Sequence, residues 1–299
     1  MTRVLVTGGN GLVGRQVVAT LLALGRKPRV VGRGAPPAGL DSRVDHVTAD
    51  LIGLDERGLR ALTEDCDTLV HLAWETRHGL FWQAPENLDW VTASVRLVKA
   101  FTERGGRRFI GAGTCVEYQP PSEGPCIPGR TPVVPTHLYA VAKNAFHRQL
   151  AARAAETGLS YAWGRVFLLI GPGEPEARLV PTLIKSLLAG TTVACSSGRQ
   201  DVRDAGEAFA WLATSEATGA FNICSGQPVT VARVAKTVGR LLGKEHLVAL
   251  GARPDRDEPP NLWGDIAQLR EATGFAPRYP LEAALQHAID GWQNPHAAH

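Results

Sequence analysis

The fold of this chain of 299 residues is decided by one stretch, Val4-Leu5-Val6-Thr7-Gly8-Gly9-Asn10-Gly11-Leu12-Val13-Gly14. Its first part is apolar and β-branched, as in a buried strand, and residues 12–24 carry apolar side chains at the spacing of one helix face. The glycines between them fit a turn that brings backbone amides and the N-terminus of the new helix close to a pyrophosphate. We therefore expect a dinucleotide to bind at Gly8, Asn10, Gly11, Leu12, Val13 and Gly14.

The composition is that of a globular protein with a sizeable core, because 44% of the residues are hydrophobic. The net charge of +3 is small and dispersed, so we expect no nucleic-acid partner. The five cysteines are scattered and lack CxxC spacing, which favours free thiols over disulfides, and we expect no metal site. No apolar run approaches the length of a membrane span, and the chain enters a strand at once. We therefore expect a cytoplasmic protein without a signal peptide or membrane contact.

Strand and helix patterns alternate along the first half of the chain. Strand-like stretches lie at residues 28–31, 44–51, 68–73, 107–113 and 160–165, and helical patterns lie between them at 55–64, 85–104 and 139–156. This alternation predicts an α/β fold with a Rossmann-type, doubly wound parallel sheet. We place the dinucleotide-binding domain at residues 1–168, with a strand that returns to the sheet near residues 219–225.

Residues at the ends of three strands indicate how the cofactor is held. The second strand ends in a glycine and Arg33, without the acidic residue that binds the adenosine ribose of NAD, and the guanidinium suits the 2′-phosphate of NADP. We expect NADP(H) as the preferred cofactor, with NAD(H) as the alternative. Asp50 can accept a hydrogen bond from the adenine amino group, with Leu51 against the ring. Leu72 and Ala73 end the fourth strand, where a small residue lets the chain pass under the cofactor.

Three residues further along the chain carry the chemistry. Thr114 ends a strand, and Tyr139 and Lys143 stand four residues apart, on one face of the next helix. An ammonium beside a phenol stabilises the phenolate and can also hold the nicotinamide ribose, so that the tyrosine serves as a general acid or base near neutral pH. The Thr114 hydroxyl would orient a carbonyl or alcohol group between them.

The combined motifs resemble those of the extended short-chain dehydrogenases/reductases, in the nucleotide-sugar epimerase, dehydratase and ketoreductase group. Further marks of the resemblance are His71-Leu72-Ala73, Gly113-Thr114-Cys115-Val116-Glu117-Tyr118, Arg165-Val166-Phe167, Gly171-Pro172-Gly173-Glu174, Phe221-Asn222-Ile223 and Gly291-Trp292. The resemblance implies that Thr114, Tyr139 and Lys143 form a catalytic triad. It also implies that residues 169–299 form mainly a smaller C-terminal substrate-binding lobe. The helices near 86–104 and 138–156 would pair two copies into a homodimer.

The same resemblance implies a nucleotide-diphosphate sugar as the substrate. Arg178 and Arg253 are candidates for binding its diphosphate, since a guanidinium binds phosphate through two hydrogen bonds. Trp74 begins a polar and aromatic stretch, residues 74–89, which we expect to form a loop over the cleft with substrate contacts.

Two departures from the family pattern narrow the reaction. Nucleotide-sugar 4,6-dehydratases have an Asp-Glu pair directly after the catalytic threonine, and Cys115-Val116 stand there in this chain, which disfavours a dehydratase. Leu168 stands where many relatives have an asparagine that contacts substrate. We expect NADPH-dependent reduction of a nucleotide-linked 4-keto-6-deoxyhexose with Tyr139 as general acid. The alternatives are an NAD-dependent nucleotide-sugar 4-epimerase and, from another class, a cofactor-binding regulator without turnover.

Overall fold

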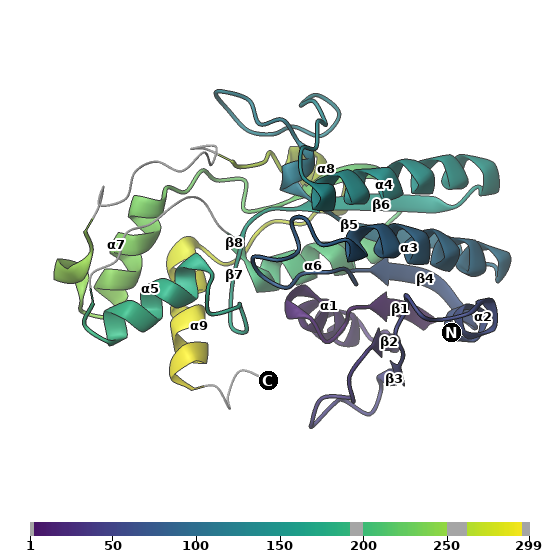
Figure 1. The fold of residues 1–299 in the computed structure, drawn as a ribbon, viewed down its shortest axis with the longest axis horizontal. Helices are drawn as coiled ribbons and strands as arrows, with labels where there is room; N and C mark the ends of the chain where they lie inside the picture. Colours follow the sequence, from purple (N-terminus) through teal and green to yellow (C-terminus); the bar gives the residue numbers. More distant parts are fainter. Residues whose placement is uncertain (1–2, 192–199, 250–261, 295–299) are drawn as a thin grey trace.

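The centre of the protein is a seven-stranded sheet in a computed structural model that describes residues 3–191, 200–249 and 262–294 (Figure 1). Neighbouring strands are all parallel, in the order β3-β2-β1-β4-β5-β6-β9. The strands are β1 Arg3–Thr7, β2 Pro28–Gly32, β3 Asp45–Thr48, β4 Cys66–His71, β5 Arg108–Thr114, β6 Ser160–Val166 and β9 Gly219–Ile223. The strand order reverses beside β1, and doubly wound folds bind ligands at the carboxyl ends of the strands at such a point. The predicted Rossmann-type α/β fold is confirmed.

Helices cover both faces of the sheet. One face carries α1 Leu12–Ala23 and α6 Val202–Ala213, and the other carries α2 Glu56–Thr63, α3 Glu86–Glu103 and α4 Leu138–Thr157. Alternation along β1 divides the two cores, because Val4 and Val6 belong to the first and Leu5 to the second. Helices α1 and α6 approach closely at Gly206, where a Cβ would lie 2.2 Å from Cβ of Gln16.

A smaller group of helices lies to one side of the sheet (Figure 1). Helices α5 Leu179–Leu188, α7 Val231–Leu241 and α9 Leu281–Gln293 share an apolar core of their own. The remaining elements are η1 Cys115–Glu117, β7 Leu169–Ile170, β8 Gln200–Asp201, η2 Glu245–Leu247 and α8 Ala267–Thr273. Since α6 and β9 pack with the main sheet, the chain crosses between the two regions more than once. Within the described ranges, no helix is long and apolar enough to cross a bilayer.

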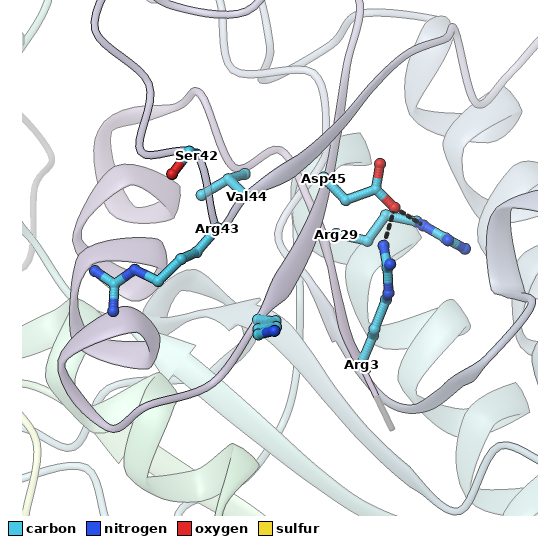
Figure 2. Close-up of a pocket in the computed structure, with 7 residues that line it drawn as sticks. Arg3, Arg29, Ser42, Arg43, Val44 and Asp45 are labelled. Atoms are coloured by element: carbon cyan, nitrogen blue, oxygen red, sulfur yellow. Dashed lines mark hydrogen bonds and ion pairs between the residues drawn. The ribbon is translucent and has the colours of Figure 1, made fainter. Parts of the chain in front are cut away.

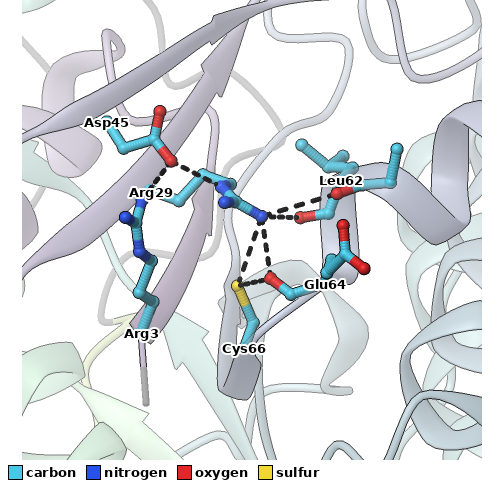
Figure 3. Close-up of polar contacts among 7 residues, drawn as sticks. Arg3, Arg29, Asp45, Leu62, Glu64 and Cys66 are labelled. Atoms are coloured by element: carbon cyan, nitrogen blue, oxygen red, sulfur yellow. Dashed lines mark hydrogen bonds and ion pairs between the residues drawn. The ribbon is translucent and has the colours of Figure 1, made fainter. Parts of the chain in front are cut away.

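Ion pairs tie together the amino-terminal ends of β1, β2 and β3 (Figure 2). The Asp45 carboxylate accepts hydrogen bonds from the guanidinium groups of both Arg3 and Arg29. Arg29 also donates to the carbonyls of Leu62 and Glu64, at 3.0 and 2.8 Å, at the end of α2 (Figure 3). The cluster therefore joins three strands and a helix at the edge of the sheet away from the glycine turn.

A hollow of about 480 Å³ lies at this same edge. Besides the ion-paired residues, it is lined by Lys27 and Arg43, and Arg43 points away from the Asp45 cluster and pairs with Asp41 (Figure 2). The basic side chains do not converge on one point, and the carboxyl ends of the strands lie at the opposite edge. A functional site is therefore expected at that opposite edge, at the carboxyl ends of the strands.

Candidate active site

The turn after β1 is pressed against the end of β4, and this close approach requires glycine at position 8. Gly8 has a φ of 70°, and a Cβ there would lie 2.8 Å from the backbone nitrogen of Ala73. Gly14, in the first turns of α1, packs on the same turn, because its Cβ would lie 2.1 Å from the Gly8 carbonyl oxygen. Helix α1 thus begins directly on the turn, as the sequence predicts for a phosphate-binding crossover.

The start of α1 suits an anion. Its N-cap residue is Gly11, which has no side chain to accept hydrogen bonds from the first amides of the helix, so these amides can serve a phosphate. Asn10 reaches the end of β2, where a Cβ on Gly32 would lie 3.0 Å from the Asn10 amide nitrogen, and it contacts His46 at 3.2 Å. Arg33 follows β2 and is exposed. The residues present therefore fit a dinucleotide.

The three predicted catalytic residues come from the end of β5 and the start of α4. Thr114 is the last residue of β5, and its side chain lies near the phenol of Tyr139, where it favours the ionised form. The Tyr139 ring packs edge-on against Phe81, with 4.9 Å between ring centroids. Lys143 lies one helix turn further and donates from Nζ to the carbonyl oxygen of Ala112 in β5, at 2.8 Å. All three side chains gather at the edge of the sheet that carries the glycine turn.

Burial sets the charge of the tyrosine and the lysine. It raises the pKa of Tyr139 above its ordinary value, and the hydrogen bond from Thr114 and the charge of Arg178 only partly oppose this. Burial also lowers the pKa of Lys143 to about 7. The phenol is therefore protonated at neutral pH. That Lys143 lowers the tyrosine pKa towards neutrality stays a prediction, because burial is the largest influence on the phenol here.

A buried ion pair lies behind Thr114. The Glu117 carboxylate accepts from the Thr114 backbone N–H and from Arg165 Nε, each at 2.8 Å, and from Trp163 Nε1 at 3.2 Å. Burial raises the pKa of Glu117, and the Arg165 charge opposes this rise. This role of Glu117 is not among the sequence predictions, although the spacing Thr-x-x-Glu is the signature of a capping box.

The sequence model of one protein family covers most of this structure. The NAD dependent epimerase/dehydratase family matches residues 4–224, from β1 to the end of β9. The chain belongs to this family. The matched range includes the glycine turn and the predicted catalytic residues Thr114, Tyr139 and Lys143.

Relatives of this family member differ in the reaction that they are named for. A dTDP-6-deoxy-L-talose 4-dehydrogenase (NAD(+)) of Aggregatibacter actinomycetemcomitans is 27% identical over 233 residues, which cover 75% of this chain and 85% of the relative. A UDP-glucose 4-epimerase of Halalkalibacterium halodurans is 25% identical over 326 aligned positions, which cover 98% and 96%. Among solved structures, MoeE5 in complex with UDP-glucose and NAD has a TM-score of 0.83 and 27% identity, covering 98% of this chain and 99% of that one.

The other residues predicted to bind the cofactor lie around the ends of β3 and β4. Asp50 is exposed and its carboxylate accepts from the backbone N–H of Ile52, at 3.2 Å, so it caps a turn after β3. Leu51 is buried in the core under α2 and α3. Leu72 and Ala73 follow β4 and are partly buried beside the glycine turn. Cofactor contacts of these four residues stay predictions.

The residues predicted to bind substrate fall in different places. Arg178 is the N-cap residue of α5, lies 4.0 Å from Glu174, and is close enough to Tyr139 to lower the pKa of its phenol. Trp74 is buried, against Lys143. Arg253 lies outside the described residues. The structure therefore brings one predicted phosphate ligand, Arg178, to the region of the predicted catalytic residues.

Proposed function

We propose that the protein is a reductase that uses NADPH to convert a nucleotide-linked 4-keto-6-deoxyhexose into the corresponding alcohol. The observation that carries this proposal is the meeting of Thr114, at the end of β5, with Tyr139 and Lys143, on the first turns of α4. A reduction needs a proton donor at the carbonyl oxygen, and a phenol that keeps its proton at neutral pH meets that need. The similarity to a dTDP-6-deoxy-L-talose 4-dehydrogenase supports the choice of sugar.

Each residue has one task in this reaction. NADPH, bound at the glycine turn, would supply the hydride. The Thr114 hydroxyl orients the keto oxygen, and Tyr139 gives its phenolic proton to that oxygen as the carbonyl becomes an alcohol. The Lys143 ammonium balances the negative charge left on the phenolate oxygen. Arg178 holds the diphosphate of the substrate, since it lies near Tyr139 at the start of α5.

The residues after Thr114 argue against a 4,6-dehydratase. Cys115 is buried, and burial raises the pKa of its thiol to about 12. A thiol with that pKa is a poor acid or base at neutral pH, and its neighbour Val116 has no titratable group. An NAD-dependent 4-epimerase is the second candidate, because the similar UDP-glucose 4-epimerase covers nearly the whole chain.

The preference for NADP(H) rests on Arg33 and on the absence of an acidic residue at the end of β2. The similar dehydrogenase and the MoeE5 complex are named with NAD, so NAD(H) is the alternative cofactor. We also propose a homodimer formed through α3 and α4, because the family resemblance implies that these two helices pair with their copies in a second chain.

Turnover with 4-keto sugars tests the proposed reaction. The purified protein is mixed with NADPH or NADH and with a dTDP-, UDP- or GDP-linked 4-keto-6-deoxyhexose. Oxidation of NADPH or NADH is then followed by absorbance. We expect many turnovers of NADPH per protein. Interconversion of a UDP-hexose and its 4-epimer without added reductant would instead establish the epimerase. A thermal-shift series with both dinucleotides identifies the cofactor, because a ligand that binds the native state raises Tm.

A further inference from the structure

Lys143 has an uncommon partner for a buried ammonium group. Its Nζ lies 4.0 Å from the ring centroid of Trp74, over the face of the indole. Both side chains are almost inaccessible, with 3% of Lys143 and 7% of Trp74 exposed. Apart from the indole, Nζ donates to the Ala112 carbonyl, and within the described residues no carboxylate forms an ion pair with it. The groups in direct contact with the cation are therefore neutral. The Glu117 carboxylate raises the pKa of Lys143 from a longer distance, and His71 lies near enough for the lysine charge to lower the pKa of its imidazole.

The indole is fixed in this orientation by its own contacts. Trp74 Nε1 donates to Oδ1 of Asn87, at 2.8 Å. The amide nitrogen of Asn87 donates to the carbonyls of Phe81 and Ala84, at 2.7 and 2.9 Å, which sets the side-chain oxygen towards the indole. Trp90 stacks on Trp74 with an angle of 24° between the rings. The loop between β4 and α3 thus presents one face of Trp74 to the lysine.

We propose that Trp74 is a positioning residue for Lys143, whose ammonium it holds in the charged form at the end of β5. This role rests on the proposed function, in which the charge of Lys143 acts on Tyr139. The face of an indole attracts a cation, and the attraction is strongest where water is excluded. Burial lowers the pKa of Lys143 to about 7, so a modest attraction decides how much of it is charged near neutral pH.

A neutral partner also preserves the effect of the lysine on the tyrosine. A carboxylate next to Nζ would stabilise the ammonium, but its negative charge would cancel the field of the lysine at the Tyr139 phenol. An indole carries no net charge, so it stabilises the cation and leaves the field in place. The geometry therefore explains why a large aromatic residue stands at position 74, in the loop that follows β4.

Direct titration of Lys143 tests the proposal without cofactor or substrate. NMR of protein labelled with ε-¹³C lysine gives the pKa, and the Lys143→Arg variant assigns the signal.

Trp74→Leu should lower the pKa of Lys143 by about one unit, and Trp74→Phe should lower it less. Trp90→Leu is the matched control, because it removes a buried indole that stacks on Trp74 while the hydrogen bond from Trp74 to Asn87 still holds the ring over the lysine, so the pKa should stay at the wild-type value. An unchanged or higher pKa in Trp74→Leu, or an equal fall in Trp90→Leu, would overturn the proposal. Trp74→Phe decides the matter if Trp74→Leu does not fold.

The pH profile of kcat/KM for NADPH oxidation gives a second readout. Lowering the pKa of Lys143 moves the alkaline limb of the profile to lower pH in Trp74→Leu, whereas a loss of packing alone would lower activity at all pH values. If wild type and variants all fail to reduce 4-keto sugars while the lysine titration still shifts, the proposed reaction is wrong and the positioning role stands. If reduction occurs but the pKa of Lys143 is the same in Trp74→Leu as in the wild-type protein, the proposed reaction stands and the positioning role is wrong.

Discussion

Replacing Glu117 with Gln keeps the size of a fully buried side chain and removes the charge that faces Arg165. Arg165 is itself buried, and its Nε lies 2.8 Å from the Glu117 carboxylate. Its other side-chain partner is the Tyr118 hydroxyl, at 3.2 Å, which carries no charge. In Glu117→Gln the guanidinium is therefore left buried without its counter-charge, and one donor of the new amide can face another donor.

The cost of this change follows from burial. Removing one member of a buried ion pair costs about 3–5 kcal/mol, because the remaining charge is desolvated without compensation. An unfolding entropy of roughly 2.1 cal/mol/K per residue makes 1 kcal/mol worth about 1.6 °C in a chain of 299 residues, so we expect a fall in Tm of about 5–8 °C. The measurement is thermal unfolding followed by circular dichroism. Glu117 also accepts from the Thr114 backbone, so kcat for the proposed reduction should fall as well.

A matched control makes the same chemical change at the surface. Glu176 pairs with Lys185 at 2.8 Å, but both side chains are more than 60% exposed (66% and 63%), so Glu176→Gln should cost at most about 1 kcal/mol. The double variant Glu117→Gln/Arg165→Met should recover part of the lost Tm, since it removes the uncompensated charge. Equal losses for Glu117→Gln and Glu176→Gln, or no recovery in the double variant, would refute the reasoning.

Three further predictions concern other parts of the fold. Tyr139→Phe should lower kcat by about a hundred- to ten-thousand-fold with unchanged NADPH affinity, measured by steady-state kinetics and fluorescence titration. Gly14→Ala should abolish the rise in Tm on adding NADPH, because its Cβ would lie 2.1 Å from a backbone oxygen, whereas Gly34→Ala, in open space, should keep that rise. Burial lowers the pKa of His71 to about 3, so the unfolded chain takes up this proton first, and the native state loses up to about 1.4 kcal/mol per pH unit below pH ~6.5. In urea unfolding between about pH 6 and pH 4, the free energy of unfolding should depend less steeply on pH in His71→Gln than in the wild-type protein.

Local patterns were enough to predict most of the fold. Residues 12–24 were predicted as a helix and α1 spans Leu12–Ala23, because the apolar spacing and the glycine turn mark both ends within the stretch itself. The strand predicted over 44–51 is shorter, since β3 ends at Thr48 and the Asp50 carbonyl then accepts from two backbone amides of a turn. Helix α6 was not predicted. Its place is set by close contact with α1 at Gly206, which the sequence around it does not reveal.

The candidate site likewise has a part that could be predicted from the sequence and a part that could not. Tyr139 and Lys143 could be predicted because their spacing is local and specific. The groups that set their environment come from distant parts of the chain: Trp74 is 69 positions before Lys143, and Arg165 is 48 positions after Glu117. Such contacts depend on how strands and loops are brought together, so only the structure shows them.

The electrostatics of the site follow from how one buried carboxylate is shared. Glu117 has two buried cations near it, and it forms its hydrogen bond with Arg165, acting on Lys143 only at longer range. The negative charge of Glu117 thereby compensates the positive charge of Arg165, as a charge buried inside a protein requires. Lys143, with a carbonyl and an indole as partners, keeps a charge that can still respond to what forms on Tyr139. If the carboxylate were bonded to the lysine instead, the buried arginine would be left without its counter-charge. The assignment of Glu117 to Arg165 and of Trp74 to Lys143 is therefore one arrangement, and each half depends on the other.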